Sequence, residues 1–245
     1  MAEVCGIDWE CKTLMTQLIG HRGAAALEPE NTLRGFKKAI ELGLDYVELD
    51  VRRCKSGELV VIHDETVDRT TNGKGLVKGM ALQQLQKLDA GKGESIPTLK
   101  EAMDLCEGKV GMILELKDAG IEADVMELVG NNWNGSLIIS SFFHERVKRT
   151  KELAETKGAS IKTAVINLGN PVNIVEMVKD AKADIYLTDR YYIDARTVDN
   201  LKRAGIIVAI GGGDTEKSMH EVLQLKPDML SSDRPDLLVK VLGRK

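Results

Sequence analysis

Four short motifs carry side chains whose types and spacing are those of an enzyme active site. Two of the four histidines lie in short apolar runs that end in charged residues, as happens where a buried strand meets a functional rim. An imidazole with a pKa near about 6.5 can take or give a proton at neutral pH, which suits acid–base catalysis. The motifs are His21-Arg22-Gly23, Glu48-Leu49-Asp50, His63-Asp64 and Glu115-Leu116-Lys117.

The elements that would position these motifs are eight short apolar runs, most of them separated by segments long enough for a helix, such as 31–43 and 191–205. Repeated strand–helix units predict a parallel sheet, and eight of them predict a closed (β/α)8 TIM barrel in one domain, residues 17–245. An open doubly wound sheet is the competing α/β architecture. The runs cover 18–20, 46–51, 110–116, 137–141, 161–166, 184–187, 206–210 and 229–231.

One further run, at 59–63, follows residue 51 too closely for a helix and a parallel return, so a hairpin is expected. With Ser56-Gly57 as a two-residue turn, Asp50 lies opposite His63, and directly opposed side chains share one face. Glu48 points the same way as Asp50 because strand side chains repeat every second residue. The hairpin is therefore expected to bring two carboxylates and a histidine together.

Residues 65–97 are polar and rich in glycine, with one short helical run at 82–88. We expect this segment to be a small insertion over the barrel mouth. It could act as a lid or bind substrate, or it could be a plain loop excursion.

Composition limits the classes of partner. Hydrophobic residues make up 43% of the 245 residues and aromatic residues only 4%, which predicts an aliphatic core of the kind that buried parallel strands have. The net charge of −4 argues against a general nucleic-acid binder or an anionic-membrane binder, because both partners need a broad basic field. An anionic substrate must therefore be bound by a few local cations.

The cysteines and the termini indicate a cytoplasmic protein. Cys5, Cys11, Cys54 and Cys106 show no paired CxxC spacing, and the first 20 residues lack the pattern of a secretory signal. No apolar run reaches about 18 residues, so no transmembrane segment is expected. Residues 1–16 are interpreted as an N-terminal extension without assigned function, and a homo-oligomer is left open.

Several motifs, taken together with their order and approximate spacing, resemble the glycerophosphodiester phosphodiesterase family. The resemblance covers about residues 18–242, and its most specific part lies in the first 73 residues. The motifs are His21-Arg22-Gly23, Pro29-Glu30-Asn31-Thr32, Glu48-Leu49-Asp50-Val51, His63-Asp64, Asp68-Arg69-Thr70-Thr71-Asn72-Gly73 and Asp233-Arg234-Pro235. The chain departs from the family after the seventh strand, where a tryptophan and a Thr-Val-Asn-like stretch are usual. Its own residues there are Val208-Ala209-Ile210-Gly211-Gly212-Gly213-Asp214.

The resemblance implies a TIM barrel with a small insertion after the second-strand hairpin. It also implies cleavage of glycerophosphodiesters to glycerol 3-phosphate and an alcohol, using a divalent cation. Attack by the glycerol hydroxyl to give a cyclic phosphate is suggested, while the sequence leaves direct hydrolysis open. Matched by motif, His21 and His63 are the general acid and base, Glu48, Asp50 and Glu115 are metal ligands, Arg22 and Lys117 bind phosphate, and Glu30 and Asn31 lie near the glycerol and metal pocket.

A phosphodiester is itself an anion, so it would be repelled by three carboxylates. Two unit charges about 4 Å apart interact by about 4 kcal/mol at an effective dielectric near 20. One cation is therefore expected between substrate and carboxylates, and all-oxygen ligands favour Mg²⁺ or Ca²⁺ over Zn²⁺. Arg22 and Lys117 would neutralise phosphate oxygens as well.

Simpler interpretations exist for individual residues. The charged residues on the strands could form a structural ion network, although buried charges at strand ends are better explained by a site. Asn31 could cap the helix expected to begin at Thr32. The triple glycine 211–213 could cradle a phosphate or simply form a turn. His144 and His220 are interpreted as surface residues.

Other functions compete with the leading one. A phosphosugar isomerase or lyase barrel would use the triple glycine for a terminal phosphate and would not need three carboxylates. A related lipid phosphodiesterase is a further alternative, and a non-catalytic ligand-binding barrel is another. Such a ligand-binding barrel would be expected to lack at least one of His21, His63 and the carboxylates.

Overall fold

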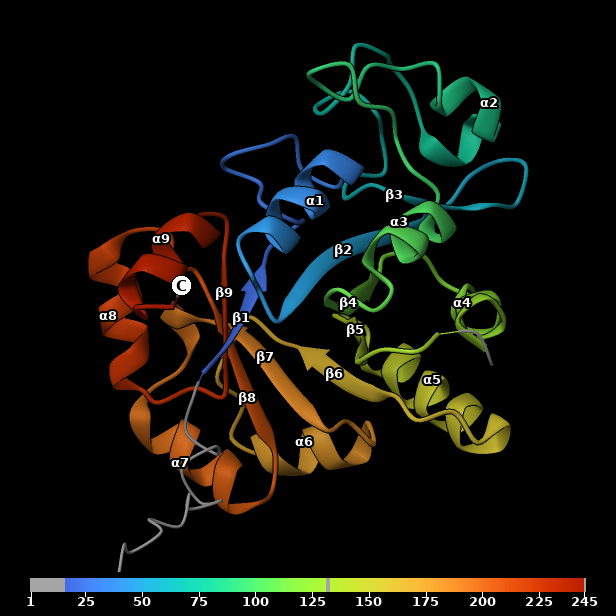
Figure 1. Cartoon of the computed structure of the whole chain (residues 1–245). Coiled ribbons are helices and arrows are strands. Elements are labelled where there is room, and N and C mark those ends of the chain that lie inside the picture. Colours follow the sequence, from blue (N-terminus) through green and yellow to red (C-terminus); the bar gives the residue numbers. More distant parts are fainter. Residues whose placement is uncertain (1–15, 131–132, 245) are drawn as a thin grey trace, which may run out of the picture.

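The computed structural model describes residues 16–130 and 133–244, which form a closed barrel of parallel strands surrounded by helices (Figure 1). The ring closes because β1 pairs in parallel with both β2 and β9. Closure confirms the predicted TIM barrel and excludes the open doubly wound sheet. The barrel strands are β1 (Gln17–Gly20), β2 (Tyr46–Arg53), β4 (Gly111–Leu116), β5 (Leu137–Ser141), β6 (Lys162–Ile166), β7 (Ile185–Asp189), β8 (Ile207–Gly211) and β9 (Met229–Ser232).

A helix follows each barrel strand, and the chain returns to the start of the next strand. Two of the predicted helices are present but shorter than expected, because each begins directly after a capping side chain: Thr32 accepts from the Gly35 amide and Asp194 from the Thr197 amide. The helices are α1 (Leu33–Glu41), α3 (Leu99–Cys106), α4 (Glu122–Val129), α5 (His144–Lys157), α6 (Ile174–Asp180), α7 (Ala195–Arg203), α8 (Glu216–Gln224) and α9 (Pro235–Val241).

An apolar layer fills the barrel, and each strand supplies one member of it. Successive side chains on a strand point to opposite faces, so the alternate residues of each strand pack outward against the helices. On β2, for example, Tyr46 belongs to the inner layer, whereas Val47 and Leu49 belong to the core beneath the helices. The layer consists of Ile19, Tyr46, Ile113, Ile138, Ala164, Ile185, Ala209 and Met229. This layer forms the floor on which any site at the carboxyl ends of the strands must stand.

The predicted hairpin is present, but its predicted register is wrong by one residue. Strand β3 (Leu59–Val61) pairs antiparallel with β2 so that Val51 faces Val61, and the Ile62 amide donates to the Asp50 carbonyl. Asp50 therefore lies opposite Ile62 and not His63. The cause is a three-residue turn, residues 55–57, closed by a bond from the Cys54 amide to the Glu58 carbonyl, with Gly57 at φ 104°.

The segment after β3 is an insertion with a small apolar cluster of its own, and Figure 1 shows it standing beyond α1 and β3. It contains a 3₁₀ turn at Val77–Gly79 and helix α2 (Leu82–Leu85), which is shorter than the predicted 82–88. Its buried side chains pack on the hairpin, so the insertion is anchored to the strand that carries Glu48 and Asp50. The cluster comprises Cys54, Val60, Ile62, Val67, Val77, Leu85, Ala90 and Ile96.

Within 16–130 and 133–244, no helix combines the length and apolarity that crossing a bilayer requires. Cys54 and Cys106 are buried free thiols, while Cys5 and Cys11 lie outside the described residues. The N-terminal extension expected at 1–16 also lies outside them, apart from Thr16.

Candidate active site

The inner faces of the strands continue upward from the apolar layer into a cavity of about 240 Å³ at the carboxyl ends of the strands. Two positions after its residue in the apolar layer, toward the carboxyl end, every barrel strand contributes a residue to the cavity lining. These residues are His21, Glu48, Glu115, Ser140, Ile166, Leu187, Gly211 and Ser231. The same alternation that fills the core therefore also determines which side chains face the cavity.

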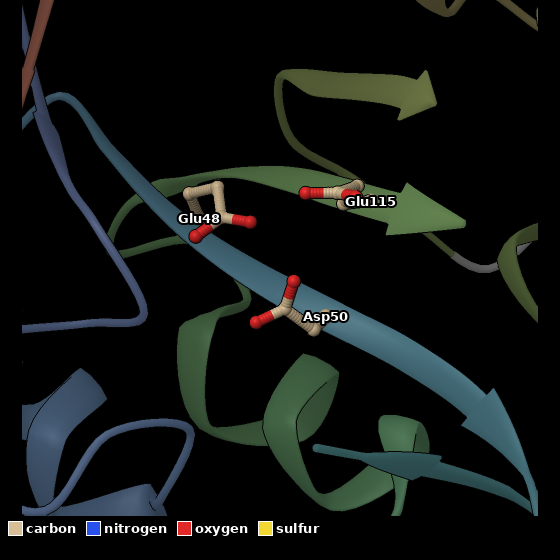
Figure 2. A group of neighbouring side chains, drawn as sticks. All are labelled: Glu48, Asp50 and Glu115. Carbon is tan, nitrogen blue, oxygen red and sulfur yellow. The ribbon is translucent and has the colours of Figure 1, made fainter. Parts of the chain in front are cut away.

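Three carboxylates meet beside this cavity, and two of them, Glu48 and Glu115, line it. Glu48 and Asp50 come from β2 and Glu115 from β4, where Asp50 and Glu115 are direct neighbours in the strand register. One oxygen of each lies within 4.8 Å of the others, and Figure 2 shows the three groups turned toward a common space. Their exposed fractions are only 6%, 1% and 8%. A cluster so deeply buried needs positive charge nearby.

Lys117 and Arg22 supply part of that charge. Lys117 Nζ lies 3.1 Å from Asp50 Oδ1 and contacts Glu115 Oε1 at 2.5 Å. Burial would raise the pKa of Asp50, but Lys117 and Arg22 hold it below its usual value. Burial, reinforced by the charge of Asp50, raises the pKa of Glu48 above its usual range. The cluster is thus incompletely neutralised by the protein's own cations.

The donor chemistry of the cluster fits a divalent metal ion. Three buried carboxylates offer only oxygen, which suits a hard cation and not a thiophilic one. The raised pKa values of Glu48 and Glu115, both caused first by burial, indicate that a further positive charge would be stabilising there. Glu48, Asp50 and Glu115, the residues predicted as ligands, would hold such an ion.

Arg22 is fixed beside the carboxylates by its own backbone. Its amide donates to Glu48 Oε2 at 2.9 Å, and it has a positive φ of 48° directly before Gly23, whose φ is 89°. Its Nη1 donates to Glu30 at 2.8 Å. Its Nε is buried, 3.5 Å from Asp50 Oδ2, and has no hydrogen-bond partner among the described residues. The guanidinium is thus held between the Glu30 and Asp50 carboxylates at the edge of the cluster.

Asn31 orients Asp50 and does not cap a helix. Its Nδ2 donates to Asp50 Oδ2 at 2.7 Å, and its Oδ1 accepts from the Asp50 amide at 3.2 Å. The capping position is occupied by Thr32 instead. The cap alternative for Asn31 is therefore wrong, and its contacts place it in the network of the site.

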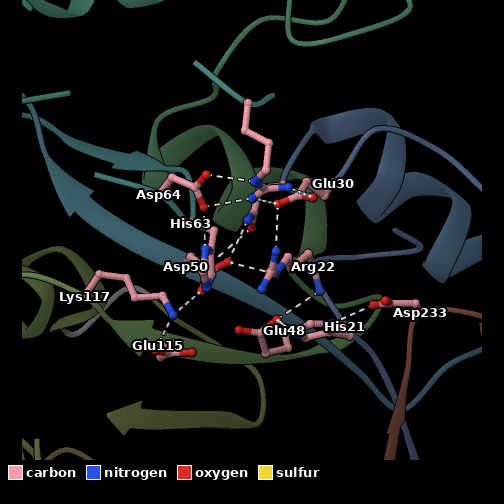
Figure 3. A network of polar contacts seen from close by, with 12 residues as sticks. His21, Arg22, Glu30, Glu48, Asp50, His63, Asp64, Glu115, Lys117 and Asp233 are labelled. Atoms are coloured by element: carbon pink, nitrogen blue, oxygen red, sulfur yellow. Dashed lines mark hydrogen bonds and ion pairs between the residues drawn. The ribbon is translucent and has the colours of Figure 1, made fainter. Parts of the chain in front are cut away.

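His21 stands at the end of β1 between two carboxylates. Its Nδ1 is 2.6 Å from Asp233 Oδ1, just after β9, and its Nε2 is 3.9 Å from Glu48 Oε2 (Figure 3). Burial lowers the pKa of His21, but the hydrogen bond to Asp233 and the charge of Glu48 together raise it to about 9. A ring held at Nδ1 presents Nε2 to the cavity.

His63 reaches the site from the hairpin in spite of the shifted register. Its carbonyl accepts from Arg52 Nε at 2.9 Å, and its Nδ1 is 2.7 Å from Asp64 Oδ1. Figure 3 shows the ring beside Asp50, and its charge acts on the pKa of both Asp50 and Glu115. The chain bends away from the strand after Ile62, and this bend brings His63 to the carboxylates.

Phe142, Ile166 and Leu168, on β6 or in the loops after β5 and β6, give the cavity an apolar wall, whereas Asp189 and Asp214 line it at the ends of β7 and β8. After β8, where a tryptophan is usual in the family that the sequence resembles, this chain has Gly211 and Gly212, and the aromatic side chain of the cavity lining is Phe142, after β5. A Cβ at Gly212 would overlap the Asp189 carboxylate, and Gly212 has a φ of 83°. Since a carboxylate already lies against this glycine, the structure favours the turn over a phosphate cradle.

The structure brings all the predicted site residues together, and it adds two acids that the sequence interpretation left without a role. Asp233 and Asp64 each bind the Nδ1 atom of one histidine. The His63-Asp64 dipeptide was a usable signal for one of these pairs. Asp233 lies 212 positions from His21, and only closure of the barrel brings them together.

We expect Asp233→Asn to lower the pKa of His21, because the variant removes the charged acceptor. The raised pKa means that His21 stabilises the fold fully below about pH 6.5 and that this stabilisation is lost as the pH rises through about 9. Histidine NMR titration of EDTA-treated protein, with unfolding followed across this range, measures both effects. Asp236→Asn on α9 is the matched control, and an unchanged His21 titration in Asp233→Asn would contradict the assignment.

Comparison with known proteins agrees with this geometry. The model of the glycerophosphoryl diester phosphodiesterase family matches residues 21–237. The chain is 34% identical over 248 residues to a glycerophosphodiester phosphodiesterase of Caldanaerobacter subterraneus subsp. tengcongensis, covering 94% of this chain and 99% of that protein.

Solved structures are similar over nearly the whole chain. A phosphodiesterase of Oleispira antarctica, solved in complex with the product sn-glycerol-3-phosphate, superposes with a TM-score of 0.86 at 28% identity, covering 95% of this chain and 98% of that one. A glycerophosphodiester phosphodiesterase of Agrobacterium tumefaciens gives a TM-score of 0.79 at 30% identity, covering 92% and 100%. The chain belongs to the glycerophosphoryl diester phosphodiesterase family.

Proposed function

We propose that this protein hydrolyses glycerophosphodiesters to glycerol 3-phosphate and an alcohol, within a single domain at 17–245. The observation that carries the proposal is the group of three buried carboxylates flanked by two carboxylate-bound histidines and two cations. A phosphodiester is an anion whose cleavage needs charge stabilisation and two proton transfers, and this group supplies both.

The chain's own residues divide the work as follows. Arg22 and Lys117 bind the phosphate oxygens in this proposal, because both cations lie against the carboxylate cluster. Asp233 and Asp64 hold the Nδ1 sides of His21 and His63, so one imidazole accepts a proton from the attacking hydroxyl or water while the other donates one to the departing oxygen. Glu30 and Asn31 keep Arg22 and Asp50 in place.

Glu48, Asp50 and Glu115 bind one divalent cation, Mg²⁺ or Ca²⁺, in this proposal. A bound ion of this kind supplies Lewis-acid stabilisation of negative charge on the phosphate oxygens. The oxygen-only donor set is the support for these two ions over zinc.

The buried free thiols Cys54 and Cys106 suit a reducing compartment, and we place the protein in the cytoplasm as part of the same proposal.

The first test is a panel of glycerophosphodiesters that includes glycerophosphocholine and glycerophosphoethanolamine. We expect release of glycerol 3-phosphate with Mg²⁺ or Ca²⁺, loss of release with EDTA, and recovery when the ion is restored. An isomerase or lyase that bound phosphate at 211–213 would keep its activity under EDTA. Failure with every glycerophosphodiester and every divalent ion would overturn the proposed substrate class.

Removing either imidazole tests the acid–base roles. His21→Ala and His63→Ala should each lower the rate by roughly 10² to 10⁴, the range typical of acid–base groups. His220→Ala is the control, because His220 is exposed on α8 and should leave the rate unchanged. If either active-site variant kept the wild-type rate, its histidine would not be a catalytic group.

A related lipid phosphodiesterase is a second candidate, favoured by exposed apolar side chains in loops at the carboxyl ends of the strands, of which Phe142 and Leu168 line the cavity. Six of the seven exposed large hydrophobic side chains in the described parts of the chain lie in the loops after β5, β6 and β7. They are Phe142, Phe143, Leu168, Val172, Tyr191 and Tyr192. Such a surface suits an acyl chain next to the reacting phosphate.

Lysophosphatidylcholine distinguishes the two candidates when it is compared with glycerophosphocholine. A lipid phosphodiesterase should release choline from the lysolipid with the lower KM, and Phe143→Ala should raise that KM several-fold without changing the KM for glycerophosphocholine. Leu76→Ala, which alters an exposed apolar residue on the insertion, is the control. Equal effects of both variants would argue against the lipid candidate.

A further inference from the structure

Arg69 reaches out of the insertion and bridges two carboxylates at the edge of the site. Its Nε and Nη2 donate to the two oxygens of Asp64 at 2.7 and 2.9 Å. Its Nη1 and Nη2 donate to the two oxygens of Glu30 at 2.7 and 2.8 Å. A single guanidinium thus makes a two-pronged contact with each acid, which is the geometry that fixes carboxylates most firmly.

The first of these acids leads to a histidine. Asp64 Oδ1 accepts from Arg69 and also lies 2.7 Å from His63 Nδ1. The hydrogen bonds from Arg69 hold the pKa of Asp64 well below its usual range despite partial burial, so Asp64 stays a charged acceptor. The orientation of His63 therefore depends on where Arg69 holds this carboxylate.

The second acid leads to the phosphate-binding arginine. Glu30 Oε1 accepts from Arg69 Nη2 and from Arg22 Nη1, both at 2.8 Å. The Glu30 carboxylate is thus shared between a guanidinium from the insertion and one from the loop after β1. Without Arg69, the Glu30 carboxylate would lose two of its three hydrogen bonds, and its contact with the Arg22 guanidinium would be less firmly oriented.

We propose that Arg69 is a positioning residue for the reaction, which orients His63 through Asp64 and Arg22 through Glu30. The inference rests on the proposed function. It also gives the insertion a role other than a lid or a loop excursion, because the insertion supplies a guanidinium that joins the His63 side of the site to the Arg22 side.

The chain offers a close comparison that lacks this connection. Arg34 Nε donates to Glu28 at 2.6 Å, and Lys92, also from the insertion, donates to the same carboxylate at 2.7 Å. The Arg34 and Arg69 side chains are similarly exposed, at 49% and 47%. Within the described residues, no hydrogen bond or ion pair of Glu28 reaches a candidate site residue. Exposed ion pairs of this kind contribute little to stability.

The test compares Arg69→Gln and Arg69→Lys with Arg34→Gln, in the presence of the divalent ion. We expect Arg69→Gln to lower kcat/KM by about 10- to 100-fold, the range seen when an orienting partner of a site residue is removed. Arg69→Lys should recover only part of the loss, because an ammonium cannot fork to both acids. Arg34→Gln should match wild type, and the melting temperatures of the variants should agree.

A double-variant cycle separates positioning from a general structural effect. In an Asp64→Asn background, Arg69→Gln should lose most of its effect on kcat, while its effect on KM, which acts through Glu30, should persist. A full kcat penalty in that background, or Arg69→Gln indistinguishable from Arg34→Gln, would overturn the inference. If wild-type protein hydrolysed no glycerophosphodiester, the proposed function would fail, and the comparison of variants would not arise.

Discussion

The site depends on the two-residue period of strands that are held in parallel register. Because the inner layer from Ile19 to Met229 closes the barrel with one side chain per strand, the next inward position on every strand must face the cavity. Charged side chains there rest on an apolar floor and open only toward the mouth. Glu48 and Glu115 stand in this ring, and Asp50 lies one step higher on β2. A shift of β2 by one residue would turn Leu49 into the cavity and would turn Glu48 and Asp50 outward, toward the surrounding helices.

Packing thus places three negative charges together, and the rest of the local chemistry can be understood as a response to them. The Arg22 amide, the Asn31 side chain and Lys117 are all directed at the carboxylates, yet burial still raises the pKa of Glu48 and Glu115. Apolar residues would fill the same space without the desolvation penalty of buried charges. Buried charges that the protein's own cations neutralise only in part are typical of functional sites.

The sequence predicted the barrel and its eight strands, and it named histidines and carboxylates that the structure brings together, because apolar runs, strand period and motif order are local properties. It could not predict what depends on turn geometry or on distant closure. The hairpin register differed because residues 55–57 make a three-residue turn, whereas a two-residue turn at Ser56-Gly57 was predicted. The two turns differ in which backbone hydrogen bond closes them, and the residue types do not determine that bond. His63 nevertheless lies beside Asp50. The reason is the bend of the chain after Ile62, and not the strand pairing that was predicted. Asp233 was visible in a motif, but its partner His21 lies at the other end of the chain.

Each of the two histidines is held by a carboxylate at its Nδ1 atom, but the two carboxylates lie in different parts of the fold. Asp64 is the next residue after His63. The contact between these two residues therefore needs only a local turn and the hydrogen bonds that Arg69 donates to the Asp64 carboxylate. His21 and Asp233 follow β1 and β9, the two strands whose pairing closes the ring. Orientation of His21 is therefore inseparable from closure of the barrel, whereas orientation of His63 depends on the insertion. A disturbance at the seam between the first and last strands should act on one imidazole, and a disturbance of the insertion on the other, so the two imidazoles are positioned by separate parts of the fold.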